Sequence, residues 1–515
     1  MLSAGIEGLT ARVEMIDAAR HTLDLQYYIF RTDESGNLIA EALLRAADRG
    51  VRVRVLLDDG ETAPGDEKLL ALAARPNIEI RIFNPLRYRG HIRTIRGAEI
   101  LFDKGRLDYR MHNKLMVADN AVAIIGGRNI GDQYFQIDPE SQFGDDDVVV
   151  AGPMVQRLSG VFDEFWNGRL AVPAQTVDER HTSERALAKY LAVLARFREH
   201  LDASRPAPMN VAHPAAMDAS HPAPTNVAHP AAMDAPHPAP MNVAHGGPTK
   251  VSRRDDPAAA AKTPFADIAS GRTPLIWAHA DLVYDSPDKK AVENGAATGA
   301  LIYRPVVDQA NAVDTELVIV TPYFIPSAEE LEILENDRKR HVQVRVLTNS
   351  LESAPDLAAH SGYMHYRVKL LREGVELHEV RALLGSTRGS GQGKAISRRG
   401  NYALHGKLFV FDRKTAFIGS MNFDERSRHL NTEIGVLIAS PELSRQVAVR
   451  FDALAQLDNA YALSLSDKSA GKEPALIWTT RVSGTVVQYQ TEPARNVWQR
   501  MKVKLLSILP LDKEL

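Results

Sequence analysis

Hydrophobic and polar positions follow the same strand–helix–strand order in both halves of the chain. In the first half, the apolar runs 22–30 and 51–59 have the β-branched and aromatic content of strands, and the amphipathic stretch 38–50 predicts a helix. In the second half, strands are predicted at 316–326 and 342–349, with a helix at 330–340. Residues 78–85 and 375–380 add one predicted strand to each half. This order indicates two units that each contain a parallel or mixed sheet.

A segment of different composition separates the two halves. Residues 206–245 repeat one octapeptide five times, with a histidine at the end of every copy: His213, His221, His229, His237 and His245. Regular proline blocks helix and sheet hydrogen bonding, and the segment offers little apolar surface to bury. We therefore expect a disordered linker at 203–262, between a first lobe at 1–202 and a second lobe at 263–515. Repeat expansion in a tolerant linker is the favoured interpretation of the histidines, and metal binding is the alternative.

A polar motif occurs once in each half. It reads HNKLMVADNAVAIIGGRN at 112–129 and HGKLFVFDRKTAFIGSMN at 405–422. Its His, Lys, Asp and Asn recur at one spacing, each pair 293 residues apart: His112 and His405, Lys114 and Lys407, Asp119 and Asp412, Asn129 and Asn422. Four polar identities within matching apolar patterns indicate an internal duplication.

These residue types suit a phosphate site that works without a metal or another cofactor. Histidine and lysine stand two positions apart on a predicted strand, so they face the same side. The Gly-Gly and Gly-Ser steps that end at Gly127 and Ser420 let the backbone approach a ligand closely. Two lysines and two asparagine amides can then stabilise the charge that develops on phosphate oxygens.

Two histidines also match the needs of phosphodiester displacement. A neutral imidazole can attack phosphorus, while an imidazolium can protonate the leaving alkoxide near pH 7. Each imidazole needs a group that holds its far nitrogen, and Asp145 and Glu433, each eight residues before a proline, are the best candidates. Asp146 and Asp147 are neighbouring alternatives to Asp145.

Several motif residues also have a structural interpretation. Asp119 and Asp412 fall where each motif strand turns, so turn capping or salt bridging is favoured over catalysis. Gly127 has tight packing as an equal alternative to ligand contact. Ser420 has no hydroxyl counterpart in the first copy, so its candidate role in substrate binding rests on one copy alone.

Both motif copies resemble the HKD motif, H-x-K-x4-D-x6-G-[G/S]-x-N, of the phospholipase D superfamily. Phrases such as LDLQYYIFRTDESG, VTPYFIPS and RSRHLNTEIGVLI are similar to the bacterial cardiolipin synthase branch, in particular its C-type members. The resemblance covers about 6–200 and 270–515. It implies an α/β fold of two similar lobes related by a pseudo-two-fold axis, each a mixed β-sheet flanked by helices.

The same resemblance implies a reaction and roles for individual residues. The reaction is phosphatidyl transfer through a phosphohistidine, with His112 as nucleophile and His405 as general acid. Lys114, Lys407, Asn129 and Asn422 would bind phosphate without a metal, and Tyr28 and Tyr323 would lie near the substrate mouth. Tyr27 and Phe324 are further candidates to wall that mouth against water.

Composition and charge limit the kinds of molecule that the protein is expected to bind. The formal charge is −3 and cysteine is absent, which excludes disulfides and thiolate chemistry and gives no global signal for nucleic acid. Basic residues exceed acidic ones locally, nine to four over 86–128 and nine to three over 385–430, which suits an anionic lipid head group, with solvated loops as the alternative. Arg87, Arg89 and Arg93 are candidates to dock a second anionic head group. No apolar run approaches the roughly 20 residues of a membrane span, and no signal peptide is evident. We expect a bacterial protein peripheral to the inner membrane.

Competing functions are hydrolysis of phospholipids, cleavage of nucleic acid by a superfamily nuclease, and a non-catalytic lipid-binding or scaffold role. Two intact motif copies argue against the scaffold, and the lipid-branch phrases argue against the nuclease. The stretch 493–510 mixes apolar and basic residues, so it predicts either an interfacial helix or a helix packed on the core.

Overall fold

A computed structural model describes residues 1–60, 66–86, 104–204, 264–269, 272–385, 401–466 and 474–508. The octapeptide segment and Arg87, Arg89 and Arg93 lie outside these ranges, so what is expected of them stays a prediction. Met1–Leu194 and Ala261–Leu515 form one compact unit, and Ala195–Ala260 form a second. Both motif copies belong to the first unit. The proposed lobe boundaries at 202 and 263 also stay predictions.

The first half is built on a seven-stranded sheet with the order β8-β6-β5-β1-β2-β3-β9. Its strands are β1 (Thr22–Tyr27), β2 (Arg52–Asp58), β3 (Ile78–Phe83), β5 (Lys114–Ala118), β6 (Val122–Gly126), β8 (Asp147–Ala151) and β9 (Ala171–Pro173). The first three run parallel, and the other neighbours pair antiparallel. The strands predicted at 22–30, 51–59 and 78–85 are confirmed, although the first ends at Tyr27.

The second half is built on a ten-stranded sheet with the order β10-β18-β16-β15-β11-β12-β13-β19-β20-β21. Its strands are β10 (His279–Tyr284), β11 (Glu316–Val320), β12 (Gln343–Asn349), β13 (Glu376–Val380), β15 (Leu408–Phe411), β16 (Thr415–Gly419), β18 (Ile434–Ala439), β19 (Ala460–Leu465), β20 (Leu476–Val482) and β21 (Thr485–Tyr489). The run from β18 to β19 repeats the order of the whole first sheet. This match confirms the expected α/β fold of two similar lobes, each a mixed sheet with helices around it.

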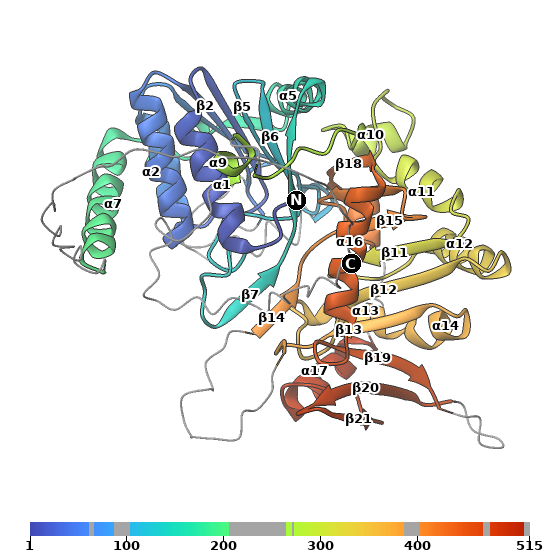
Figure 1. Cartoon of the computed structure of the whole chain (residues 1–515). Helices are drawn as coiled ribbons and strands as arrows, with labels where there is room; N and C mark the ends of the chain where they lie inside the picture. The colour runs from blue at the N-terminus through green and yellow to red at the C-terminus, as the bar shows by residue number, and fades with distance from the viewer. Residues whose placement is uncertain are drawn as a thin grey trace, which may run out of the picture. The chain divides into compact units, whose positions relative to one another are not determined.

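Helices connect and cover the strands (Figure 1). They are α1 (Gly5–Ala18), α2 (Glu34–Asp48), the 3-10 helix η1 (Asp66–Ala74), α4 (Lys104–Leu107), α5 (Pro153–Trp166), α6 (Ala174–Val177), α7 (Glu184–Ser204), α9 (Pro264–Ala269), α10 (Lys289–Glu293), α11 (Tyr303–Asn311), α12 (Ala328–Lys339), α13 (Leu357–Met364), α14 (Arg367–Arg372), α15 (Glu425–His429), α16 (Pro441–Ala455) and α17 (Val497–Leu506). Among the described residues, none of them has the length and hydropathy needed to cross a bilayer.

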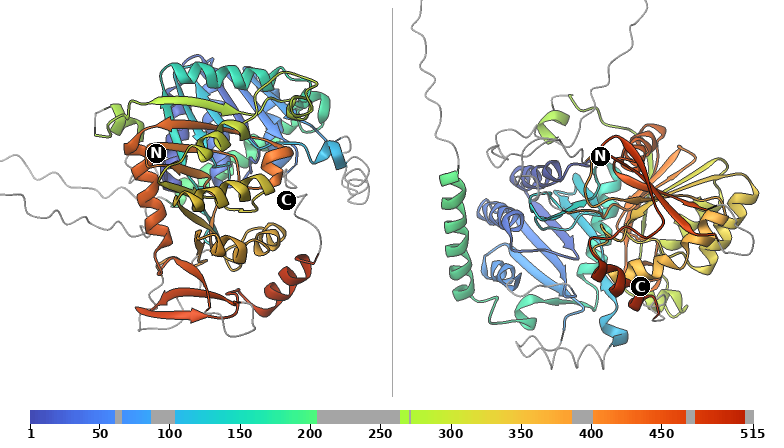
Figure 2. Two further views of the ribbon diagram at one scale, coloured as in Figure 1. Left: turned by 90° about the vertical axis from the view of Figure 1, so that its right-hand side faces the viewer. Right: turned by 90° about the horizontal axis from the view of Figure 1, so that it is seen from below.

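Three apolar cores hold the compact unit together. One core packs α1 and α2 on the first sheet, and another packs α11, α12 and α13 on the second. The third core contains residues of both sheets, with Leu115 and Ile125 from the first and Leu408 and Ile418 from the second, together with α5 and α16. Figure 2 shows the covering helices of the two halves on opposite outer sides of the paired sheets. Burial of a shared core makes the two halves one cooperative body.

Two short ladders cross from one half to the other. β4 (Arg110–Met111) pairs in parallel with β17 (Asn431–Thr432), and β7 (Ser141–Gly144) pairs in parallel with β14 (Asn401–Leu404). β7 and β14 lie side by side in Figure 1. Each ladder ends immediately before a motif histidine. The pairing between the halves therefore determines which residues of the other half contact each histidine.

Candidate active site

Sheet pairing brings the motif residues to one edge of each sheet. Lys114, the first residue of β5, lies opposite Tyr27, the last residue of β1, because the two strands are antiparallel. In the second half, Leu408 lies opposite Val320 in the same way, and Lys407 directly precedes it. The motifs therefore begin where the parallel strands end, which is the edge at which α/β sheets place their ligands.

Each imidazole is held by a carboxylate from the other half of the chain. Nδ1 of His112 lies 2.9 Å from Glu433, and Nδ1 of His405 lies 2.5 Å from Asp145. The crossing ladders cause this exchange: the amide of His112 donates to Thr432 O at 2.9 Å, and that of His405 donates to Gly144 O at 2.7 Å. Glu433 and Asp145 follow these two acceptors directly. All four side chains are buried.

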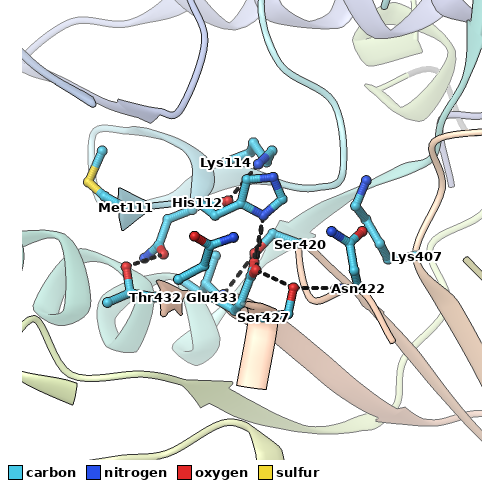
Figure 3. Close-up of polar contacts among 12 residues, drawn as sticks. Met111, His112, Lys114, Lys407, Ser420, Asn422, Ser427, Thr432 and Glu433 are labelled. Carbon is cyan, nitrogen blue, oxygen red and sulfur yellow. Dashed lines mark hydrogen bonds and ion pairs between the residues drawn. The ribbon is translucent and has the colours of Figure 1, made fainter. Parts of the chain in front are cut away.

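The predicted carboxylates are thus brought to the imidazoles, in an exchanged pairing that sequence spacing did not show. Figure 3 shows Glu433 against the ring of His112, with Ser420 and Ser427 bonded to it and Lys407 and Asn422 beside them. A single site containing side chains of both motif copies follows from this geometry.

Both motif lysines are buried and point back along their own motif. Nζ of Lys114 donates to the carbonyl of His112 at 2.6 Å, and Nζ of Lys407 donates to the carbonyl of His405. Burial lowers the pKa of Lys407 to about 8, although Asp145 and Glu433 oppose the shift. Burial likewise lowers the pKa of Lys114 well below its usual value, with Glu433 opposing. Two buried amino groups beside two neutral rings suit the binding of an anion, whose charge favours their protonated forms.

The motif asparagines each leave a polar atom without a protein partner. Oδ1 of Asn129 accepts from the amide of Ile29 at 3.1 Å, and its Nδ2 has no hydrogen-bond partner among the described residues. Oδ1 of Asn422 is also buried and unpartnered within the described ranges. Buried polar atoms are normally paired, so Nδ2 of Asn129 can donate to a bound ligand and Oδ1 of Asn422 can accept from one.

Gly127 and Ser420 occupy equivalent positions with different contacts. The Ser420 hydroxyl donates to Glu433 at 2.5 Å and accepts from the amide of Ile434 at 3.0 Å, so it fixes the carboxylate that holds His112. A β-carbon added at Gly127 would overlap Oδ1 of Asp145 and touch Cδ of Lys407. The first copy therefore has glycine because its carboxylate occupies the space that a side chain would need. The predicted contact of these two residues with substrate stays a prediction.

Three consecutive acids of the first half have three different partners. Asp145 holds His405, whereas Asp146 binds Arg450 of α16 at 2.8 Å. Asp147 accepts from Arg12 at 3.0 Å and from Arg128 at 2.6 Å, and both guanidinium groups are buried. The choice of Asp145 over its neighbours agrees with this geometry.

Asp119 and Asp412 lie away from the imidazoles and fix the motif turn. Asp119 accepts backbone amides of residues 20, 21 and 22 at the start of β1, and Asp412 accepts those of residues 314, 315 and 316 at the start of β11. Both residues have a positive φ of 52°. Although burial opposes the shift, these amides lower the pKa of Asp412 to about 2. The favoured turn-capping interpretation describes their contacts.

Asp58 and Asn349 position the histidines, and sequence analysis missed them. Asp58 ends β2 and accepts the amide of Met111 at 2.8 Å, directly before His112. Asn349 ends β12 and accepts the amide of Leu404 at 2.8 Å, directly before His405, and it also donates to Leu404 O at 2.9 Å. The two residues end equivalent strands, β2 and β12, and this shared position could have identified them. Comparison of the two halves did not, because one residue is Asp and the other is Asn.

Aromatic rings surround both imidazoles. The ring of Tyr28 lies edge-on to His112 at 4.9 Å, and its expected place at the substrate mouth stays a prediction. His405 instead meets Tyr134 at 5.2 Å and stacks with Phe143 at 5.3 Å. Neither of these two rings was anticipated, because neither has an aromatic counterpart in the other half.

Three other aromatic residues that were expected at the substrate mouth make contacts away from the two imidazoles. Tyr323 lines a small pocket with Asp356 and His360 at the end of β11. The prediction that Tyr27 and Phe324 wall the mouth is wrong, because both are fully buried. The Tyr27 hydroxyl accepts from Arg12, and Phe324 packs on Phe423.

Burial and, after it, nearby lysines lower the pKa of both imidazoles. Burial is the largest cause for His112, and the charges of Lys114 and Lys407 keep its pKa well below 6.5. Burial and Lys407 lower the pKa of His405 to about 4, against the opposing effect of Asp145. Both rings are therefore neutral near pH 7 in the free protein.

The pKa values of the two supporting carboxyl groups shift in opposite directions. Burial raises the pKa of Glu433 to about 7, although Lys114 and the bond from Ser420 oppose it. Burial also acts on Asp145, but His405 and Lys407 outweigh it and lower its pKa. Asp145 stays ionised, so it is the stronger partner for a protonated imidazole. Across the described ranges, no group of three or more His, Cys, Asp or Glu side chains is arranged to hold a metal ion.

Comparison with known proteins gives concordant matches. A family model described as "Cardiolipin synthase, PLD-like domain" matches residues 13–166 and 306–455. The chain is 33% identical over 512 residues to cardiolipin synthase C of Escherichia coli K12, covering 99% of this chain and 94% of the relative. It is 23% identical over 441 residues to a cardiolipin synthase of Halalkalibacterium halodurans, covering 85% and 62%. The crystal structure of phosphatidylserine synthase from Haemophilus influenzae matches with a TM-score of 0.57 at 12% identity, covering 100% of this chain and 94% of that one, which shows a shared fold.

Proposed function

Because the chain belongs to the cardiolipin synthase, PLD-like domain family, we propose that it is a phosphatidyltransferase that makes cardiolipin from phosphatidylglycerol and a second phospholipid. The observation that carries the proposal is the exchanged pairing of His112 with Glu433 and of His405 with Asp145, next to two buried lysines. Two imidazoles on opposing carboxylates suit an in-line displacement in two steps.

In the first step, Nε2 of neutral His112 attacks phosphorus of the donor lipid. A phosphorus–nitrogen bond forms as the bond to the leaving alkoxide breaks, and protonated His405 gives that alkoxide its proton. Lys114, Lys407, Asn129 and Asn422 bind the phosphate oxygens, where negative charge accumulates. The anionic substrate supplies what the free site lacks, since its charge raises the imidazole pKa values and allows His405 to be protonated.

In the second step, neutral His405 takes the proton from the acceptor's hydroxyl. The acceptor oxygen then attacks phosphorus, the bond to His112 breaks, and the phosphatidyl group passes to the acceptor. The assignment of His405 as the proton carrier is supported by the ionised state of Asp145. The higher pKa of Glu433, about 7, suits a partner of the neutral attacking ring.

Transfer requires that an alcohol reach the intermediate before water. The rings of Tyr28, Tyr134 and Phe143 cover the two imidazoles and support partial exclusion of water. This favours transfer over hydrolysis. Action at the membrane surface, where acceptor lipid is concentrated, belongs to the same proposal.

The test is product analysis with purified protein. Vesicles of phosphatidylglycerol, with and without phosphatidylethanolamine, should yield mainly cardiolipin by mass spectrometry. Phosphatidic acid as the dominant product across lipid mixtures would make the protein a hydrolytic phospholipase. Cleaved nucleic acid with unchanged lipid would make it a nuclease.

A further inference from the structure

Helix α17 carries its large apolar side chains on the outside. Four side chains in the helix are more than half exposed: Val497 62%, Trp498 76%, Met501 56% and Leu505 67%. Ile508, just beyond the end of the helix, is 78% exposed. Their spacing places them on one helical face. Val503 on the opposite side is 1% exposed and faces the protein. The alternative of a helix whose apolar face packs on the core is therefore not what the fold shows.

The orientation of α17 is set by polar anchors on its inner side. Asn496 caps its first turn by accepting the amide of Gln499 at 2.9 Å. Gln499 donates to Leu351 O at 2.7 Å, and Arg495 donates to Glu352 O at 2.5 Å. Near the other end, Nε2 of His365 lies 3.1 Å from Ser507 O. The apolar face is thus presented by a helix fastened at both ends.

The charged side chains of residues 493–508 all have one sign. Residues 493–508 contain four basic side chains and no acidic one. Arg495, Lys502 and Lys504 are exposed, and Lys502 and Lys504 lie on the two edges of the apolar face. Long basic side chains at the edges of an apolar face suit the boundary between lipid tails and anionic head groups.

We propose that the exposed face of α17 docks the protein on an anionic lipid bilayer. The basic side chains beside the apolar face favour a bilayer over a protein partner. The proposal also rests on the proposed function, since the phospholipid substrate resides in a membrane. The helix is tied through Leu351 and Glu352 to the loop that follows β12, and it packs on α13. Because α13 lines the pocket of Tyr323, docking would hold that pocket at the lipid surface.

Flotation with vesicles tests the proposal on the full chain. Trp498→Gln/Met501→Gln/Leu505→Gln should reduce the fraction bound to phosphatidylglycerol–phosphatidylethanolamine vesicles by roughly tenfold or more, because three exposed apolar side chains lose their burial in lipid. The matched control is Leu275→Gln/Trp277→Gln, which alters side chains that are 48% and 84% exposed outside α17. It should bind vesicles as the unmodified protein does.

A charge variant separates lipid electrostatics from apolar contact. Lys502→Glu/Lys504→Glu should weaken binding to phosphatidylglycerol vesicles and leave the weaker binding to phosphatidylcholine vesicles unchanged. Equal flotation of the triple variant and the unmodified protein would overturn the proposal, as would an equal loss in the control. A dimer by light scattering that the triple variant abolishes would also overturn it, by making α17 a protein interface.

Failure of the proposed function would look different. Short-chain phosphatidylglycerol below its critical micelle concentration needs no bilayer, so the triple variant should turn it over at the unmodified rate. Absence of any transfer product from both proteins, with flotation still lost only in the α17 variants, would refute the proposed reaction and leave the docking surface intact.

Discussion

The carboxylate of Glu433 lies 2.9 Å from Nδ1 of His112, although 321 residues separate them in the chain. Asp145 reaches His405 across 260 residues in the opposite direction. Neither motif histidine is therefore paired with a carboxylate of its own half in the described ranges. Glu433→Gln and Asp145→Asn keep the shape of each pair and remove its charge. We expect each to lower kcat by roughly 100-fold or more with little change in Tm, measured by initial rates and thermal unfolding. Normal turnover in either variant would show that the charge is not needed.

The two histidines should be separable by trapping the intermediate. With a radiolabelled phosphatidyl p-nitrophenyl ester, whose leaving group needs no proton, and rapid denaturation at alkaline pH, His405→Ala should retain label on the protein, because attack by His112 remains possible but the group that activates the acceptor is missing. His112→Ala should retain none. Both variants should lose turnover by several orders of magnitude. Label retained by His112→Ala alone would reverse the assigned roles.

Gly127 should tolerate no side chain. Gly127→Ala places a β-carbon on Oδ1 of Asp145, so that carboxylate must move and release His405. We expect this variant to lower kcat strongly and Tm only slightly. Ser420→Ala at the equivalent position is the matched control, and it should cost roughly tenfold, since it removes only the hydroxyl bond to Glu433. A smaller effect in Gly127→Ala than in Ser420→Ala would contradict the packing argument.

The alkaline limb of the pH profile should report Lys407. Its pKa is lowered to about 8, and only its protonated form offsets phosphate charge, so kcat/KM should fall as pH rises through about 8. Lys407→Arg keeps the charge to much higher pH, so its profile should stay level there, at a lower absolute rate. A limb at the same pH in this variant would assign the titration to another group.

Asn349 should not accept a carboxylate. It donates to the carbonyls of Leu404 at 2.9 Å and of Pro322 at 3.2 Å, so Asn349→Asp places negative charge against two acceptors. The cost should be about 1–3 kcal/mol. Burial raises the pKa of a carboxyl group above its unfolded value, so the folded variant retains its proton longer and loses stability as pH rises. The difference in Tm from the unmodified protein should therefore be larger at pH 8 than at pH 5. An equal difference at both values would mean that the carboxylate finds another donor.

Local patterns predicted what depends on local structure. The strands around the motifs and the spacing of His112 and Lys114 follow from side-chain alternation, which is encoded within a few residues. The exchanged carboxylates depend on ladders between distant segments, and no pattern near Asp145 states which histidine it will meet. Tyr134 and Phe143 escaped notice for a related reason, since the search relied on duplication and these rings occur in one half only.

The exchange of carboxylates also sets an order on biosynthesis. His112 and Asp145 are synthesised long before Glu433 and His405. Strands β4 and β7 likewise remain unpaired until β17 and β14 have been made. A ribosome that stalls before residue 405 releases a chain with neither pair formed. Both pairs are thus absent from every product truncated before residue 405, and they form together only when residues 405–433 fold onto the first half.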